Sequence, residues 1–378
     1  MRSSKQLILV LVAVCFAILA PAALNYIIDP YQIHGEIDGQ MPELRFQARW
    51  QNPSLIRHCL NGTDTEFDTV LIGTSMGQNF IPSELQATLG SGRVLKLNMA
   101  GSQPEMDLMV MAMVLQSPNV KRVLWEITLQ YSSTETTPLS QLDTFPQHLY
   151  GTEWSDRVKT LFSADTLEKS FRSLRNGHHI RKYDEWNTWY VEDQWEKLRQ
   201  EELLERMPEY TAKLLKAYPG TEPIVLQVGS ETTEFDYPLI DRIAELARTR
   251  PDVEFDFFFP PRSALNYALS TNGLDRLLQM PPYAARLLTQ LPGVDVHGFH
   301  DTGEIVLNLN HYKDVGHYGP EINRWMARAI RDRTHLLTPE RIDTYQRRRL
   351  EFIKQVIEDA RAGRLEISGG AELPVPAS

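Results

Sequence analysis

Short apolar runs that alternate with helical patterns constrain this chain most, because they determine what kind of sheet it can build. The runs are rich in β-branched and aromatic residues, and most are followed by glycine, proline or serine. They predict five strands, at residues 69–72, 94–99, 120–129, 253–259 and 294–299.

Helical patterns separate these runs and predict helices at 106–115, 239–247 and 274–291, the last with a break at Pro281-Pro282. Alternating strands and helices favour an α/β fold, here a three-layer sandwich around a mainly parallel five-stranded sheet. Ligands of such sheets bind outside the carboxyl ends of the strands, so we expect the functional residues there.

The rest of the chain is assigned around this sheet. Between residues 133 and 222 the strand pattern stops, and a polar segment with four tryptophans predicts a helical insertion over the sheet edge. Residues 224–228 suit either an extra strand or the return to the sheet. The predicted divisions are a membrane anchor or signal peptide at 1–28, a lead-in at 29–65, the α/β domain at 66–333, a charged helix at 334–362 and a disordered tail at 363–378.

An apolar run of 18 residues at 7–24 follows Arg2 and Lys5, and it is long enough to cross a bilayer as a helix. Basic residues before the run and an acidic remainder after it predict that residues from 25 onward lie outside the cytoplasm. The expected location is a single pass through the inner membrane with a periplasmic or extracytoplasmic body. The small residues at 20–23 also suit a signal peptidase, so cleavage remains an alternative.

Composition excludes several classes of function. The chain has 378 residues and a net charge of −10, which argues against a nucleic-acid partner. Two cysteines, Cys15 and Cys59, are too few for a disulfide framework or a zinc site. The histidines at 178–179, 297 and 300 lack partners at a recognised spacing, so neither a metal nor a cofactor is predicted.

The residues that predict chemistry are a serine and an acid–imidazole pair. Ser75 directly follows the first predicted strand, where its amide is expected at the start of a helix that favours an oxyanion. Asp314 and His317 precede Pro320, which suits the start of a helix to about residue 331. An aspartate that holds one imidazole nitrogen while the other faces a serine hydroxyl is the arrangement that activates a nucleophile.

Three further residues are expected around this group. Gly101 follows the second strand without a side chain to block a substrate, so its amide is the predicted second oxyanion donor, and Asn98 is expected to support that loop. Arg262 follows the fourth strand and would lie where a substrate binds, with Ser263 as an ordinary helix cap beside it.

The order of these residues resembles that of the SGNH (GDSL-like) esterase superfamily. Within it, the chain is most similar to the membrane-anchored proteins encoded beside membrane-bound O-acyltransferases in bacterial envelope-polysaccharide loci, relatives of the alginate acetylation and teichoic-acid D-alanyl transfer proteins. The matching segments are residues 25–31 (NYIIDPY), 70–75 (VLIGTS), 97–102 (LNMAGS), 257–261 (FFFPP) and 312–318 (YKDVGHY).

This resemblance implies an SGNH/flavodoxin-like fold with Ser75, Asp314 and His317 as a catalytic triad, and a retained anchor. It implies an acyl donor, a carbohydrate acceptor and a membrane-bound O-acyltransferase as partner, with O-acetylation of an exopolysaccharide as the expected activity. The chain departs from the family at Trp125-Glu126-Ile127, where other members carry an asparagine that donates to the oxyanion. A non-catalytic scaffold or polysaccharide-binding subunit is therefore the alternative function.

Overall fold

A computed structural model describes residues 4–35, 41–62, 66–142, 145–151, 153–176, 181–220, 235–270 and 273–365. The predictions for residues 178–179 and 224–228 lie outside the described residues, as does most of the predicted tail. The chain forms two compact units. One comprises residues 1–66 and 137–186, and the other comprises residues 67–136 and 187–378.

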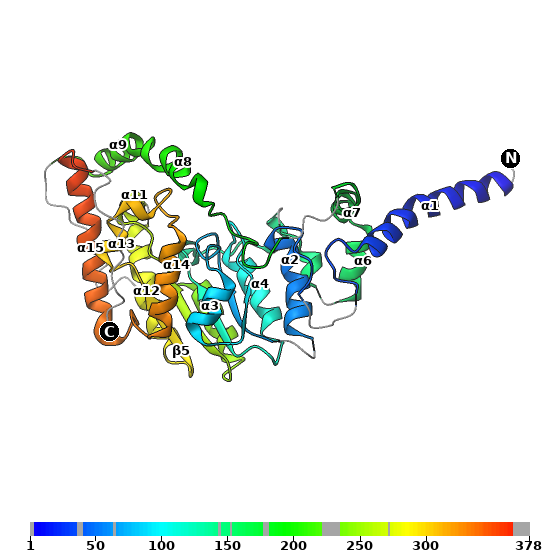
Figure 1. Cartoon of the computed structure of the whole chain (residues 1–378), viewed down its shortest axis with the longest axis horizontal. Coiled ribbons are helices and arrows are strands. Elements are labelled where there is room, and N and C mark those ends of the chain that lie inside the picture. Colours follow the sequence, from blue (N-terminus) through cyan, green and yellow to red (C-terminus); the bar gives the residue numbers. More distant parts are fainter. Residues whose placement is uncertain are drawn as a thin grey trace. The chain divides into compact units, whose positions relative to one another are not determined.

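The first unit begins with the helix α1, Ser4–Ile28, drawn in blue in Figure 1. Its stretch Gln6–Ile28 is long and apolar enough to cross a membrane, and only 6% of its most apolar segment of 18 residues is buried. An apolar helix with so little protein cover is consistent with membrane anchoring.

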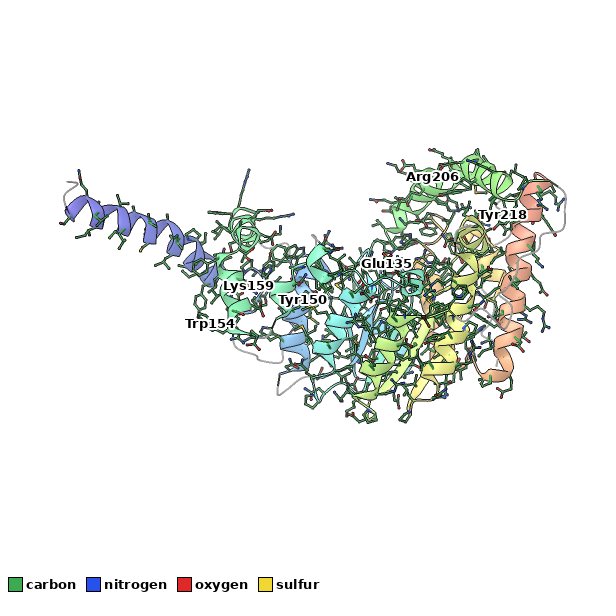
Figure 2. All side chains as sticks on the ribbon, turned by 180° about the vertical axis from the view of Figure 1, so that it is seen from behind. Glu135, Tyr150, Trp154, Lys159, Arg206 and Tyr218 are labelled. Atoms are coloured by element: carbon green, nitrogen blue, oxygen red, sulfur yellow. The ribbon has the colours of Figure 1, made fainter. Side chains whose placement is uncertain are left out.

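The other secondary-structure elements described in this unit are helices and helical turns, and their packing depends on residues just after α1. Tyr31 is fully buried, donates to Asp165 Oδ2 over 2.8 Å and stacks on Trp50. Tyr150, labelled in Figure 2, donates to the Arg49 carbonyl over 2.8 Å. The helices are α2 (Ala48–Leu55), a π-helical turn (Ile56–Leu60), a 3-10 turn (Leu139–Gln141), α5 (Gln147–Tyr150), α6 (Trp154–Phe162) and α7 (Ala164–Asn176).

The second unit contains the five-stranded sheet, and every strand pair in it is parallel. The strand order is β2-β1-β3-β4-β5, so β2 is added on one side of β1, whereas β3, β4 and β5 are added on the other. The strands are β1 (Phe67–Ile72), β2 (Arg93–Lys96), β3 (Arg122–Glu126), β4 (Glu254–Phe259) and β5 (Val294–Gly298). The α/β class and the five strands are confirmed, and the reversal of order marks the carboxyl ends of β1 and β3 as the expected ligand crevice.

Helices cover both faces of this sheet. Leu71, Leu124 and Phe258 form one core with α3 (Pro82–Leu89) and α14 (Pro320–Arg331). The residues that alternate with them, such as Val70, Val123 and Phe257, are equally buried. Buried residues of α4 (Pro104–Val114) and α10 (Pro238–Arg248) lie outside that core, and these two helices contact each other.

The structure divides the predicted insertion between the two units, because α5, α6 and α7 belong to the first and residues 187–220 to the second. The C-terminal helix is present as α15 (Pro339–Arg361), which packs on α9, α11 and α12. The other elements of the second unit are Leu129–Ser132, Glu192–Gln194 and Leu309–His311 (3-10), Gln200–Leu204 (π), α8 (Trp195–Arg199), α9 (Met207–Ala217), α11 (Ala264–Leu269), α12 (Leu274–Leu288) and α13 (Gly303–Val306).

The predicted break at Pro281-Pro282 is wrong, because α12 continues through both prolines. Proline lacks the amide proton that would bond to the carbonyl four residues earlier, which for Pro282 is that of Leu278. The buried Arg349 of α15 donates to this carbonyl over 3.2 Å. A side chain from another helix therefore supplies the donor that Pro282 lacks.

Candidate active site

Ser75 lies in the loop after β1, at the carboxyl edge of the sheet. Every residue from Thr69 to Phe80 is buried except Ser75, which is partly exposed. The loop begins at Gly73, whose φ of 154° is one that side chains rarely adopt, and a Cβ there would lie 2.4 Å from the Glu126 Cβ. Ser75 is therefore the one partly exposed residue of a tightly packed loop.

The expected helix start at Ser75 is wrong. Residues 74–80 form successive turns, with Gly77 N donating to Thr74 O and Gln78 N donating to Ser75 O, and α3 begins only at Pro82. The fixed φ of proline suits the first turn of a helix, which explains the later start. An oxyanion at Ser75 would thus meet turn amides and not a helix N-terminus.

The structure brings the three predicted catalytic residues into contact. The Ser75 Oγ lies 2.7 Å from His317 Nε2, and His317 Nδ1 lies 2.7 Å from Asp314 Oδ2. When Nδ1 carries the proton and donates it to the carboxylate, Nε2 is free to accept the serine proton. Residues 242 positions apart in the chain thus form one continuous proton path, because the loops after β1 and before α14 meet at the same edge.

Asp314 is held in its ionised form. Its burial alone would raise the pKa, but the contact with His317 and the amides of Gly316 and His317, which both donate to Oδ1, lower it to about 2. The same two amides fix the turn that aims His317 at Ser75. The following helix α14 spans Pro320–Arg331, as the sequence predicts.

Residues after β4 contact the turn that contains Asp314 and His317. Ser263 caps α11 by accepting from Asn266 N over 3.1 Å, and its hydroxyl also donates to the Val315 carbonyl over 2.5 Å. Arg262 lies against the same turn, since a Cβ on Gly316 would be 3.2 Å from its guanidinium. The structure thus places Arg262 beside the triad, and its contact with a substrate stays a prediction.

The loop after β2 runs beside the Ser75 loop, because Met99 N donates to Gly73 O over 2.8 Å. Asn98 is fully buried and donates to Thr74 O over 3.4 Å, which fits the expected supporting role. Gly101 is exposed, with a φ of 64° and nothing within 4 Å of an added Cβ. Its surroundings are open enough for a substrate, and its role as oxyanion donor remains a prediction.

Glu126 lies in the segment Trp125-Glu126-Ile127, where the sequence departs from the pattern of the resembled family. It is fully buried at the end of β3 and accepts from Thr74 Oγ1 over 2.6 Å. Burial raises the pKa of Glu126 to about 7, although the Thr74 hydroxyl, the Arg262 charge and the amides of Thr74 and Gly77 favour ionisation. The Glu126 carboxyl group therefore supports the loop that carries Ser75 from the neighbouring strand β3.

A further segment, which the sequence analysis does not predict, holds the loop that carries Ser75. Residues 187–190, which we call the strap, belong to the predicted insertion and make five hydrogen bonds to the loops after β1 and β2. The bonds are Trp189 Nε1 to Ser75 O (2.7 Å), Asn187 Nδ2 to Asn98 O (2.6 Å), Gln78 Nε2 to Asn187 Oδ1 (2.8 Å), Thr188 Oγ1 to Asn79 Oδ1 (2.9 Å) and Tyr190 N to Asn79 Oδ1 (3.2 Å).

Trp189 of the strap also borders the imidazole. Its ring meets that of His317 edge to face, with centroids 5.6 Å apart, and Lys313 Nζ lies 4.9 Å from its centroid. Trp195 and Tyr190 continue a partly exposed aromatic surface next to it. The tryptophans within residues 133–222 are conspicuous in the sequence, but only the fold shows that Trp189 contacts Ser75.

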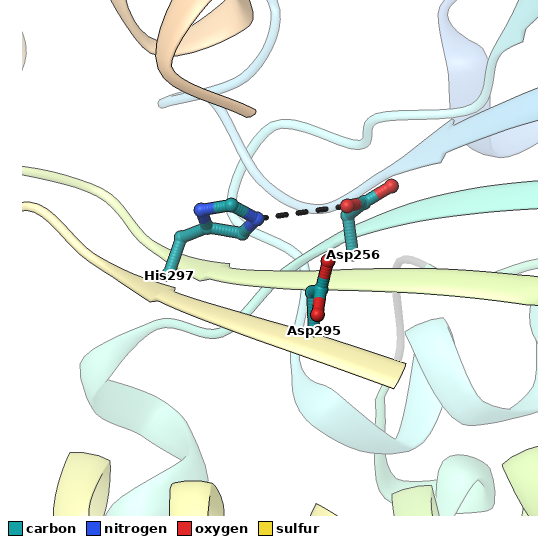
Figure 3. Close-up of side chains that lie close together, drawn as sticks. All are labelled: Asp256, Asp295 and His297. Carbon is teal, nitrogen blue, oxygen red and sulfur yellow. Dashed lines mark ion pairs between the residues drawn. The ribbon is translucent and has the colours of Figure 1, made fainter. Parts of the chain in front are cut away.

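A second acid–imidazole cluster lies in the same sheet, away from this site. Asp256 of β4 is paired with Asp295 of β5, and His297 Nε2 lies 3.6 Å from Asp256 Oδ1 (Figure 3). The three side chains are close enough for a metal ion. However, Arg122 binds Asp256 over 2.7 Å and Arg333 binds Asp295 over 2.8 Å, so the two carboxylates are already neutralised and we assign no metal site.

Comparisons with known proteins leave the family open. No family model and no curated protein matches the chain. A solved structure from Streptococcus pneumonia, provisionally described as a platelet activating factor, is similar over 76% of this chain and 89% of its own. The identity is 12% and the TM-score 0.36, too low to support an argument about function.

Proposed function

We propose that this chain is a membrane-anchored serine acyltransferase or esterase of the SGNH-like kind. The observation that carries the proposal is the continuous contact from Ser75 through His317 to Asp314, with 2.7 Å at each step. The strand order β2-β1-β3-β4-β5 is also that of flavodoxin-like sheets, in which ligands bind at the β1/β3 switch point where Ser75 lies.

The proposed reaction is acyl transfer in two steps. His317 Nε2 takes the Ser75 proton as Oγ attacks the acyl carbonyl, and Asp314 stabilises the imidazolium. The amides of Ser75 and Gly101 hold the oxyanion, and the leaving alcohol departs with the proton from His317. A sugar hydroxyl or water then attacks the acyl-serine while His317 takes its proton. The bond between the acyl carbon and Ser75 Oγ breaks, and His317 returns the proton to Oγ.

The substrate part of the proposal follows from the anchor and the family resemblance. We place α1 across the inner membrane and the body outside the cytoplasm, where an envelope polysaccharide is the acceptor. The acyl group, proposed to be acetyl, would come from a membrane-bound O-acyltransferase. Exclusion of water by the strap and its aromatic surface would favour transfer over hydrolysis.

The test is Ser75→Ala in the full-length chain in nanodiscs, assayed with p-nitrophenyl acetate. We expect turnover to fall at least about 10⁴-fold with thermal unfolding unchanged, because the side chain is small and partly exposed. Ser155→Ala, on an exposed serine of α6, is the matched control. Labelling by a fluorophosphonate should map to Ser75 by mass spectrometry.

Equal turnover in Ser75→Ala and wild type would exclude the enzyme and leave the scaffold function. Transfer and hydrolysis are separated by offering the acyl donor together with an oligosaccharide. Acylated sugar supports the transferase, whereas free acid alone supports the esterase.

A further inference from the structure

Helices α6 and α7 of the first unit bury their small polar residues. The side chains with the least exposure are hydroxyl residues, at 0% to 8%: Thr160 in α6, and Thr166, Ser170 and Ser173 in α7. A helix on the surface of a water-soluble protein normally turns its apolar stripe toward the protein and its polar face outward. These two helices do the reverse.

The large apolar side chains of each helix lie on one face, which is exposed at Trp154, Phe171 and Leu174 and partly exposed at the other three positions. In each helix they recur at helical spacing, i, i+4 and i+7, which places them on one face: Trp154, Val158 and Leu161 in α6, and Leu167, Phe171 and Leu174 in α7. The exposed fractions are 78% for Trp154, 56% for Phe171 and 57% for Leu174, and Phe162 beside them is 51% exposed. Exposed large apolar side chains that gather on one face of a helix, and are not scattered singly, mark a site of interaction.

The position of these helices identifies what the surface meets. Asn25 of α1 donates to the Leu161 carbonyl over 2.8 Å and accepts from Ser170 Oγ over 2.9 Å. Asn25 lies three residues before the end of the candidate span Gln6–Ile28, so α6 and α7 lie beside α1 where it would leave the bilayer. Figure 2 shows Trp154 and Lys159 in this region, next to the end of α1.

The composition of the two helices suits that location. Residues 154–176 carry five basic and three acidic side chains, whereas the whole chain has a net charge of −10. Basic residues beside an apolar stripe with tryptophan and phenylalanine are typical of helices in the plane of a membrane interface that contains anionic lipid. Long basic side chains reach the headgroups while their stems stay apolar.

We propose that α6 and α7, residues 154–176, form an interfacial helix pair whose apolar stripes lie among the lipids around α1. The helix pair adds a second contact with the membrane, which fixes the depth and orientation of the first unit at its surface. The proposal rests on α1 crossing the membrane and is independent of the activity proposed above.

The test places the fluorophore NBD on single cysteines in the full-length chain, in nanodiscs of phosphatidylcholine and phosphatidylglycerol. Phe171→Cys and Leu174→Cys report the stripe, and Glu168→Cys, 68% exposed on the polar side of α7, is the matched control. Cys15→Ser removes the exposed native thiol from these variants, and Cys59 is buried. Unmodified Cys15 is labelled separately to report α1.

We expect blue-shifted emission at 171 and 174 that is quenched by lipids carrying a doxyl group near the headgroup, with water-like emission at 168. Water-like emission at 171 and 174 while Cys15 is shielded overturns the interfacial helix pair but leaves the span. Water-like emission at Cys15 as well overturns both the span and the interfacial helix pair. Shielding at 171 without quenching by lipid means that protein covers the stripe, which also overturns the proposal.

Discussion

Two acid–imidazole clusters of the second unit differ in what surrounds the imidazole. At the carboxyl edge, Asp314 and His317 lead to a partly exposed serine hydroxyl. Within the sheet, Asp256 and His297 are almost fully buried, and Arg122 forms an ion pair with the Asp256 carboxylate. The carboxylates of both clusters have lowered pKa values despite burial. An acid–imidazole pair therefore indicates catalysis only where its free nitrogen faces an accessible nucleophile.

The largest expected effect comes from replacing the histidine of each cluster by alanine. His317→Ala should lower ester turnover at least about 10⁴-fold and change the free energy of unfolding by less than about 1 kcal/mol, because the side chain is 30% exposed. His297→Ala should keep turnover and lose about 3 kcal/mol of stability, because it removes a buried partner of Asp256. Turnover assays and urea unfolding of both variants check this, and similar phenotypes for the two would erase the distinction.

A second prediction sharpens the comparison through Glu126, whose pKa is raised and not lowered. The folded protein binds the Glu126 proton more tightly than the unfolded chain does, so stability should fall as pH rises from about 4.5 to about 7. Glu126→Gln keeps an uncharged partner for Thr74 and should be the more stable protein at pH 8, by about 3 kcal/mol.

Urea unfolding between pH 5 and pH 8 measures this difference. Asp107, buried and with a pKa raised to about 8, should preserve part of the pH dependence in the variant. An unchanged slope in Glu126→Gln would show that this carboxyl group does not titrate in the folded protein.

The smallest expected effect concerns the strap. Trp189→Phe keeps a ring near His317 but removes the donor to the Ser75 carbonyl, a bond worth about 1 kcal/mol. We expect kcat to fall about fivefold, because about 1.4 kcal/mol corresponds to a factor of ten in rate, with Trp195→Phe as a control that touches the same aromatic surface. A larger loss in Trp195→Phe would assign the effect to the surface and not to the loop.

Much of this architecture could be predicted from local pattern. The strands and the loop residues at 73–75 and 314–317 follow from short apolar runs, turn residues and Pro320, all of which act within a few positions of the chain. The strap could not be predicted, because its bonds join residues 187–190 to residues 75–98 and no periodicity records such pairing. Glu126 was visible as a departure, but the burial that raises its pKa depends on the loop after β1, where Gly73 and Gly77 pack against its side chain.

The contact between Arg349 and the Leu278 carbonyl also determines when helix α12 can be completed during folding. During synthesis, α12 leaves the ribosome some seventy residues before the arginine that bonds to it. Until α15 arrives, the middle of α12 exposes a carbonyl that the Pro282 backbone cannot satisfy, so this helix should be completed only when the C-terminal part of the chain docks. A chain truncated before α15 is then expected to lack not only its last helix but also a fully bonded earlier one.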